Sequence, residues 1–366
     1  MNVLYVTNYR YYQDSMPNSG TLQIEYRNKK CIETLQNRGI NFVYFDTPIS
    51  FFDNLFLRST PQVIRDISKQ LDSGLYTHIY FSHSFYGRIA EYVKKRYPHI
   101  IIVTFFHNVE YPHHNDRKKV NGISSLLNKC IQLCSLKQNE KKSCKYSDTI
   151  IVLNKRDSND IKRIYGRAAD YIIPTSLDDL YNKEKAQITN HKDLNYLFIG
   201  SNFYANVRGL QWFISNVMPH IKGKLYIVGT GMDEVKFKDI DPERVTIIGY
   251  VEDLSTYYYD ADIVINPILS GSGMKTKTAE AMMYGKTIVG TRESFEGYDI
   301  DNENIYECNS SEAFIETLNR LNSTGAISRF NQGVRDIFLR SYTLDGALAQ
   351  FRQVFKQESN NLQIKN

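Results

Sequence analysis

Short apolar runs rich in Val, Ile, Tyr and Phe alternate with longer, helix-compatible stretches along most of this 366-residue chain. The runs occur at Asn2–Val6, Asn41–Phe45, His78–Phe81, Ile100–Phe105, Thr149–Leu153, Tyr171–Ile173, Asn195–Ile199, Lys224–Val228, Val245–Ile248, Asp262–Asn266 and Thr287–Val289. Alternation of short strands with long connections is typical of βαβ units, whose strands form a parallel sheet. The sequence therefore predicts an α/β protein.

The chain is too long for one average domain, since domains usually span roughly 100 to 200 residues. Pro174–His191 is polar and lacks sustained periodicity, which is typical of a linker. We therefore predict a first domain over residues 1–173, a linker over 174–192 and a second domain over 193–343. The chain looks helical from Glu312 to its end, and apolar residues recur every three or four positions between Leu344 and Phe355. We predict a C-terminal helix over residues 344–366.

The composition excludes several classes of protein. Hydrophobic residues make up 42% of the chain and charged residues 23%, values that favour neither disorder nor a fibrous repeat. No apolar run approaches the roughly 18 to 20 residues of a membrane span, and the segment Met1–Asn8 does not resemble a signal peptide. Five scattered cysteines without a C-x-x-C pair suggest neither a disulfide framework nor zinc. We expect a cytoplasmic protein.

Charge is distributed unevenly. Residues 1–172 hold 25 basic and 15 acidic side chains, whereas the remainder holds 20 and 25. A basic half attracts anionic partners such as nucleic acid, a phospholipid surface or a diphosphate-carrying acceptor. The apolar segment Phe51–Arg58 and the basic stretch Arg117–Lys145 together suit a lipid-linked acceptor at the inner membrane face. The alternative is a helix that packs its phenylalanines into the core beside a solvated basic surface.

Glycines mark the ends of several predicted strands in the second half, at Gly200, Gly229, Gly249 and Gly290. Parallel sheets bind ligands at the carboxyl edge, where glycine permits a close approach to the backbone. The loop Ser270–Gly273 follows one such strand and leads into a helix around Thr278–Tyr284. A helix start offers free N–H groups to phosphate, and Lys275 and Lys277 add two cations. The alternative is a flexible surface turn with solvated lysines.

The second half resembles the carboxy-terminal domain of the GT-B glycosyltransferases of family 4, which are retaining enzymes that use nucleotide-sugar donors. The segments that carry the resemblance are Phe198–Ser201, Asn206–Phe213, Gly249–Val251, Asp253–Leu254, Ala261–Asp262, Glu280–Met282 and Gly285. In the first half, Phe106–Glu110 resembles the His-containing loop of the acceptor domain, and Ser19–Gly20 lies where the family has a glycine loop near the donor phosphates. The resemblance covers nearly the whole chain and implies two Rossmann-like domains facing each other across a cleft.

The resemblance implies roles for individual residues. Glu280 matches the second glutamate of the family's E-x7-E motif, which binds the donor ribose hydroxyls, but Ser272 stands where the first glutamate belongs. In the absence of that glutamate, we expect the backbone N–H groups of Gly271–Met274 to contact the donor sugar. Arg208 and either Lys275 or Lys277 are the candidates for neutralising the donor diphosphate, and His107 is the candidate for contacting a sugar hydroxyl. The expected donor-binding residues are Gly20, Gly200, Tyr250, Val251, Gly271, Ser272, Gly273, Met274, Thr276 and Glu280.

Neither of two acidic or histidine-rich segments favours a metal site. His113, His114 and Asp116 lack a zinc-ligand spacing, and Asp299–Asp301 is a D-x-D sequence that here continues the GT-B pattern. We therefore expect no metal and no cofactor, with the nucleotide sugar as donor substrate. Each candidate could instead have no role in catalysis or binding. The arginine and lysines could be solvated, the histidine could be buried with all its hydrogen bonds made inside the protein, and the glutamate could be exposed on its helix.

The sequence as a whole favours a metal-independent, retaining, hexosyltransferase-like enzyme that transfers a sugar to a glycan or lipid-linked acceptor. The resemblance suggests a role in bacterial surface polysaccharide synthesis, in the cytoplasm or peripherally at the inner face of an anionic membrane. One alternative is a sugar-nucleotide epimerase of the same fold. Another is a non-catalytic protein that binds nucleotide sugars or nucleic acid, although no nucleic-acid-binding signature is present.

Overall fold

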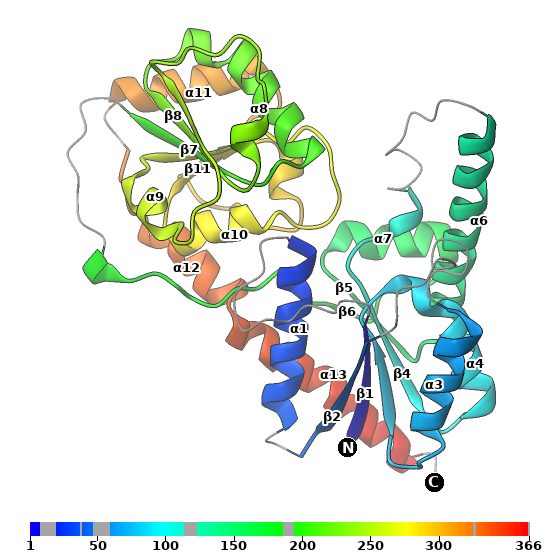
Figure 1. Ribbon diagram of the computed structural model, residues 1–366. Coiled ribbons are helices and arrows are strands. Elements are labelled where there is room, and N and C mark those ends of the chain that lie inside the picture. Colours follow the sequence, from blue (N-terminus) through cyan, green and yellow to red (C-terminus); the bar gives the residue numbers. More distant parts are fainter. Residues whose placement is uncertain are drawn as a thin grey trace. The chain divides into compact units, whose positions relative to one another are not determined.

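The structure is a computed structural model that describes residues 1–7, 20–36, 39–46, 59–112, 123–185, 194–324 and 327–364. The chain divides into two compact units (Figure 1). Unit 1 comprises residues 1–17, 21–174 and 347–366, and unit 2 comprises residues 18–20 and 175–346. The predicted apolar segment Phe51–Arg58 and the basic residues Arg117–Lys119 lie outside the described residues.

Unit 1 contains a six-stranded sheet in the order β2-β1-β3-β4-β5-β6. All of its paired strands are parallel. The strands are β1 (Asn2–Thr7), β2 (Asn41–Asp46), β3 (His78–Phe81), β4 (Ile101–Phe106), β5 (Thr149–Val152) and β6 (Tyr171–Ile172). Because the inner strands β1, β3, β4 and β5 are buried between helices, their apolar runs are nearly continuous rather than alternating, whereas Val43 of β2 and Ile172 of β6 at the sheet edges are exposed.

The helices of unit 1 cover both faces of its sheet (Figure 1). In the described ranges they are α1 (Gly20–Gln36), α3 (Pro61–Leu71), α4 (Gly87–Arg96), α6 (Ile123–Tyr146), α7 (Lys155–Tyr165) and α13 (Leu344–Ile364). Ile79 and Phe81 of β3 belong to the core shared with α3 and α4. The alternate residues His78 and Tyr80 contact Phe355 and Phe351 of α13. The period of two along β3 thus divides its side chains between the two helical layers.

Unit 2 contains a second parallel six-stranded sheet, in the order β12-β11-β10-β7-β8-β9. Its strands are β7 (Asn195–Ile199), β8 (Lys224–Val228), β9 (Val245–Ile248), β10 (Ile263–Asn266), β11 (Thr287–Gly290) and β12 (Ile305–Glu307). This strand order is that of a doubly wound dinucleotide-binding fold. The predicted fold class, two Rossmann-like α/β domains with parallel sheets, is confirmed.

The helices of unit 2 are α8 (Tyr204–Asn216), α9 (Ser255–Asp260), α10 (Thr276–Met283), α11 (Ser311–Thr324) and α12 (Gln332–Ser341). Helices α8 and α11 pack together on the sheet, where Phe213 and Phe314 meet edge to face at 5.7 Å. Short 3-10 turns connect several elements, at Ser84–Tyr86, Lys183–Lys185, Met218–His220, Met232–Glu234 and Arg292–Phe295.

The C-terminal region is helical, as the sequence predicted. It forms α11, α12 and α13, and α13 begins at Leu344, where the C-terminal helix was expected. Strand β12 is an addition that the sequence analysis did not predict, because its three residues form no recognisable apolar run. No helix within the described ranges is long and apolar enough to cross a membrane.

Candidate functional site

Each sheet has one point where the strand order reverses direction, and ligands of doubly wound folds bind there, beyond the carboxyl ends of the strands. In unit 2 this point lies between β7 and β10, and in unit 1 between β1 and β3. Most of the predicted site residues follow strands that flank these two points. The two regions are described separately, as the unit 2 site and the unit 1 site.

Lys277 is the cation that the structure places at the unit 2 site. The Nζ atom of this half-buried lysine donates to Asn206 Oδ1 at 2.7 Å and lies 4.0 Å from the centre of the Phe198 ring. Burial lowers the pKa of Lys277 to about 7. A side chain on Gly200 would bring its Cβ within 2.6 Å of the Lys277 Nζ atom. Glycine at the end of β7 therefore leaves the room that this ammonium group occupies.

Lys275 has a different environment. Its Nζ atom donates to Glu293 Oε1 at 2.6 Å and to the carbonyl oxygen of Gly273 at 3.0 Å. The ammonium group therefore joins the glycine loop to the 3-10 turn after β11, and it is already neutralised by a carboxylate. Of the two lysines that the sequence analysis left as alternatives, only Lys277 lies beside Gly200 at the end of β7.

The glycine loop makes a tight connection between β10 and α10. Gly273 has a φ of +61°, a left-handed conformation that favours glycine. Gly271 and Ser272 are partly exposed, whereas the Met274 side chain is buried and its sulfur accepts from the backbone N–H of Thr175 at 3.4 Å. Thr276 is the first residue of α10. The first-turn N–H groups of α10 therefore start directly after the loop.

Glu280 lies one helical turn beyond Lys277 on α10. Its Oε2 atom accepts a hydrogen bond from the Tyr258 hydroxyl at 2.9 Å. The Tyr258 ring stacks on Tyr284 with ring centres 4.6 Å apart, and burial raises the pKa of Tyr258 well above its usual value. Tyr258 is therefore a permanent donor that fixes the direction of the Glu280 carboxylate.

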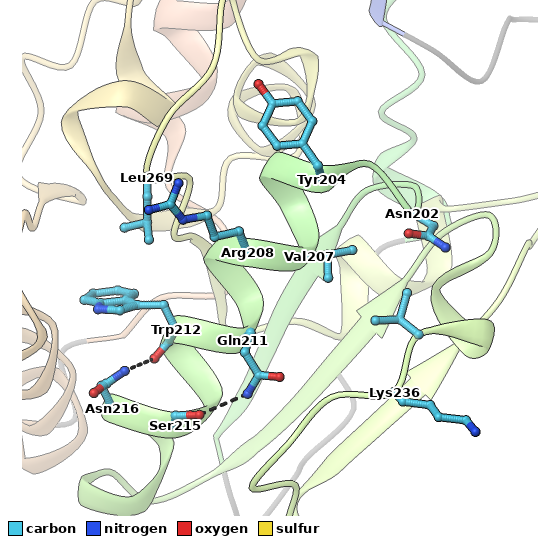
Figure 2. A pocket seen from close by; sticks show the side chains of 11 residues that line it. Asn202, Tyr204, Val207, Arg208, Gln211, Trp212, Ser215, Asn216, Lys236 and Leu269 are labelled. Atoms are coloured by element: carbon cyan, nitrogen blue, oxygen red, sulfur yellow. Dashed lines mark hydrogen bonds between the residues drawn. The ribbon is translucent and has the colours of Figure 1, made fainter. Parts of the chain in front are cut away.

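Arg208 lies on α8 and lines a surface pocket of about 730 Å³ (Figure 2). Figure 2 shows its guanidinium group beside Leu269, which follows β10, and on the same helix face as Trp212. The remaining predicted residues at this edge are Tyr250 and Val251, which follow β9, and the Tyr250 side chain is 61% exposed.

The unit 1 site contains one predicted residue, His107, and two that the sequence analysis missed, Glu25 and His83. His107 follows β4, and its Nε2 atom lies 3.0 Å from Glu25 Oε1. His83 follows β3, and its Nε2 atom lies 3.3 Å from the same oxygen. All three side chains are buried. Gly20 opens α1, the helix that carries Glu25, and the residues just before it are outside the described ranges.

The missed residues had sequence signals of different strength. His83 follows a predicted strand end by two positions, so the argument that selected His107 applies to it equally. Glu25 lies within a helix, and Tyr258, Asn206 and Glu293 lie on elements far from their partners in sequence. Only the folded chain brings these four to their partners.

Glu25, His83 and His107 also form the one group within the described residues whose ligand atoms lie close enough to hold a metal ion, within 4.8 Å of one another. Two imidazoles and a carboxylate are donors that zinc accepts. A 3.0 Å separation between an imidazole nitrogen and a carboxylate oxygen is equally a normal hydrogen bond.

The comparison with protein families concerns unit 2. Residues 193–323 match the family model described as "Glycosyl transferases group 1". This segment is a glycosyl transferase group 1 domain. The group 1 domain contains β7 to β12 and carries Lys277, Glu280 and Arg208. No curated protein matches the chain in sequence.

Solved structures resemble the entire chain. A sucrose-phosphate synthase from Thermosynechococcus elongatus aligns with a TM-score of 0.73 at 13% identity, covering 98% of this chain and 99% of that one. The lipopolysaccharide outer core galactosyltransferase WaaB in its apo form gives 0.68 at 14% identity, and Anabaena HepE in complex with UDP gives 0.68 at 12%. Each of the last two alignments covers 98% of this chain and 100% of the other. The predicted GT-B fold, to which these structures belong, is confirmed.

Proposed function

We propose that this protein is a glycosyltransferase that moves a sugar from a nucleotide-sugar donor to a hydroxyl group of a glycan or lipid-linked acceptor. The observation that carries the proposal is Lys277, a half-buried cation in the first turn of α10 whose Nζ atom lies beside Gly200 in the group 1 domain. An ammonium group at the N-terminal end of a helix suits a diphosphate. The structure of HepE bound to UDP-glucose supports a donor of this class.

The group 1 domain supplies the donor contacts in this proposal. Lys277, oriented by Asn206, neutralises charge that develops on the diphosphate as the bond to the sugar breaks. Arg208 is a second candidate for this role. The Glu280 oxygens accept hydrogen bonds from the ribose hydroxyls, and the exposed Tyr250 with Val251 lies where the base would bind. Lys275 holds the glycine loop in place through Glu293.

Fewer residues are proposed for the transferred sugar and for the acceptor. We propose that His107 contacts a sugar hydroxyl and that transfer retains the anomeric configuration, as the resemblance to family 4 implies. No side chain is assigned as an enzyme nucleophile, so the departing phosphate is the proposed base for the acceptor hydroxyl. Ser272 in place of the first glutamate of E-x7-E leaves the donor sugar to the N–H groups of Gly271–Met274.

The finer parts of the proposal are a hexosyl donor, independence from metal, and a role in bacterial surface polysaccharide synthesis. WaaB, named as a lipopolysaccharide galactosyltransferase, supports that role by its similar fold. The basic first half of the chain supports a cytoplasmic enzyme that contacts the inner face of an anionic membrane peripherally. Because Lys277 and the N–H groups at the start of α10 offer positive charge to a diphosphate, the proposed reaction needs no metal cation.

A panel of nucleotide sugars tests the function. A donor that binds the folded state raises the melting temperature, and the best donor is then incubated with candidate acceptors to detect a glycosylated product. The proposal expects transfer that continues in EDTA. Conversion of the donor without any acceptor would indicate the epimerase instead, and binding without any turnover would indicate a non-catalytic protein. Loss of transfer in EDTA that manganese restores would contradict metal independence.

A further inference from the structure

The unit 1 site is built around Glu25, a carboxylate with no exposed surface. Its Oε1 atom faces His107 Nε2 at 3.0 Å and His83 Nε2 at 3.3 Å. Its Oε2 atom accepts a hydrogen bond from the Tyr5 hydroxyl at 2.7 Å. The Tyr5 hydroxyl and the His107 imidazole therefore lie within hydrogen-bond distance of this buried carboxylate, and the His83 imidazole lies within ion-pair distance of it.

This arrangement determines where the proton of His107 lies. A carboxylate oxygen can only accept, so the imidazole nitrogen that faces it carries a hydrogen. In a neutral histidine, the hydrogen bond made by one ring nitrogen sets the state of the other. With hydrogen on Nε2, the Nδ1 atom of His107 is an acceptor. Within the described ranges, this buried Nδ1 atom has no hydrogen-bond partner.

Packing fixes the ring itself. His107 lies nearly parallel to His83, with ring centres 4.3 Å apart and an angle of 21°. On β4, Phe105 meets the His107 ring edge to face at 5.2 Å. The ring is held by these contacts whichever nitrogen is protonated, so Glu25 decides the position of the proton rather than the position of the ring.

Other buried polar atoms near these strand ends also lack partners among the described residues. They are both amide atoms of Asn28, one turn from Glu25 on α1, and the hydroxyl of Ser82, beside His83. Buried polar atoms are nearly always hydrogen-bonded, to water or ligand where protein groups are missing. His107 Nδ1 and these atoms are thus buried donors and acceptors whose partners the described protein groups do not supply.

We propose that Glu25 is a positioning residue that holds the proton of His107 on Nε2, so that Nδ1 accepts a hydrogen bond from a hydroxyl group of a bound sugar. Glu25 does not itself touch the sugar. This inference rests on the proposed glycosyltransferase function, since that function supplies the sugar.

The first test reads the tautomer directly and needs no turnover. Nitrogen-15 chemical shifts of the imidazole rings, assigned with His83→Gln and His107→Gln, should show hydrogen on Nε2 of His107 in the wild-type protein. In Glu25→Gln the amide can donate as well as accept, so we expect a mixture of both tautomers. An unchanged tautomer in a folded Glu25→Gln variant would overturn the proposal.

The second test is kinetic and uses the best donor from the nucleotide-sugar panel. Glu25→Gln should lower kcat by about 10- to 100-fold, the usual effect of removing a group that orients a functional histidine. The Kd for the nucleoside diphosphate should stay within about twofold of wild type, since that ligand is bound by unit 2 residues. The double variant Glu25→Gln/His107→Gln should be no slower than His107→Gln alone, because Glu25 acts only through His107.

Tyr5→Phe is the matched control, because it removes one hydrogen bond from Glu25 and leaves both imidazole contacts. It should lower kcat less than Glu25→Gln does.

Two results would overturn the proposal. The first is a kcat of Glu25→Gln/His107→Gln that is lowered by the losses of both single variants combined. The second is stoichiometric zinc binding that Glu25→Gln abolishes, which would make the cluster a metal site. If the wild-type protein transfers no sugar from any donor, the proposed function fails and so does the sugar ligand, whereas the NMR test still decides the role of Glu25 toward His107.

Discussion

At the scale of single residues, Lys277 predicts a pH dependence of donor binding. Burial lowers the pKa of Lys277 to about 7, so the free protein loses the ammonium charge as the pH rises through neutrality. A diphosphate binds the charged form, so its affinity should fall by about tenfold per unit above pH 7 until the pKa of the bound state is reached. Calorimetry with the best nucleoside diphosphate at pH 6 to 9 measures this, and Lys277→Met should bind more weakly with a flatter profile.

Lys286 provides a matched control for that experiment. Its pKa is also lowered to about 7 by burial, but its Nζ atom donates to the carbonyl oxygens of Ala261 and Arg329 at 2.9 and 2.7 Å. Both lysines bind fewer protons in the folded state than in the unfolded state between about pH 7 and 10.5, so each makes the unfolding free energy rise with pH over that window. Lys286→Met should therefore flatten the stability profile and leave the affinity profile unchanged. A flattened affinity profile in Lys286→Met would show that the pH effect does not belong to Lys277.

Glu280 leads to a prediction about which part of the donor it contacts. Glu280→Ala should weaken binding of a nucleoside diphosphate by about 10- to 100-fold, since hydrogen bonds to a charged group contribute about 1.5 to 3 kcal/mol. Binding of inorganic pyrophosphate, which has no ribose, should not change. Tyr258→Phe keeps the carboxylate and should cost less than Glu280→Ala. An equal loss of affinity for the nucleoside diphosphate and for pyrophosphate would show that Glu280 does not bind the ribose.

At the scale of elements, the contact between α4 and α6 depends on a glycine. A Cβ atom on Gly87 would lie 1.9 Å from the carbonyl oxygen of Asn139 and 2.7 Å from the backbone nitrogen of Ser143. Gly87→Ala must push the helices apart, and we expect it to destabilise the protein by about 1 to 3 kcal/mol. Urea denaturation measures the change.

Gly346 at the start of α13 is the control for Gly87. Its nearest obstacle is the Thr343 Oγ1 atom at 3.4 Å, an ordinary contact distance. Gly346→Ala should therefore be neutral or stabilise the protein by up to about 1 kcal/mol, because alanine favours helix. Two variants of equal stability would mean that α4 and α6 tolerate the added methyl group without a cost.

At the scale of the whole molecule, the uneven charge predicts membrane association. The first 172 residues carry an excess of ten basic side chains, and the remainder an excess of five acidic ones. Binding to anionic liposomes should therefore exceed binding to neutral ones and should weaken with salt, because the Debye length falls from about 10 Å at 0.1 M to about 3 Å at 1 M. Cosedimentation measures both effects.

Charge reversal at Arg117, Lys118 and Lys119 should reduce liposome binding and leave donor affinity unchanged. Equal binding to neutral and anionic liposomes, or none to either, would leave a soluble acceptor as the better hypothesis. These three residues lie outside the described part of the chain, so this prediction rests on the sequence.

The sequence by itself determined the fold class. The apolar runs from Asn2–Val6 to Thr287–Val289 coincide with strands β1 to β11 within one or two residues, because strands buried on both faces need nearly continuous apolar sequence. It also pointed to the glycine loop and to Glu280, because these lie within one short segment after a strand. Strand β12 was not predicted, because its pairing with β11, and not its own composition, makes it a strand.

Only the tertiary structure decided which charged groups meet. Lys275 and Lys277 are equivalent in sequence, but Glu293 neutralises one of them, and Gly200 and Asn206 make room for the other. His107 could be selected from the sequence because it follows a predicted strand, but its partner Glu25 lies 82 positions away on another element. Sequence patterns report local periodicity, whereas hydrogen bonds and ion pairs depend on distances that the chain sets only when the sheet and its helices have assembled.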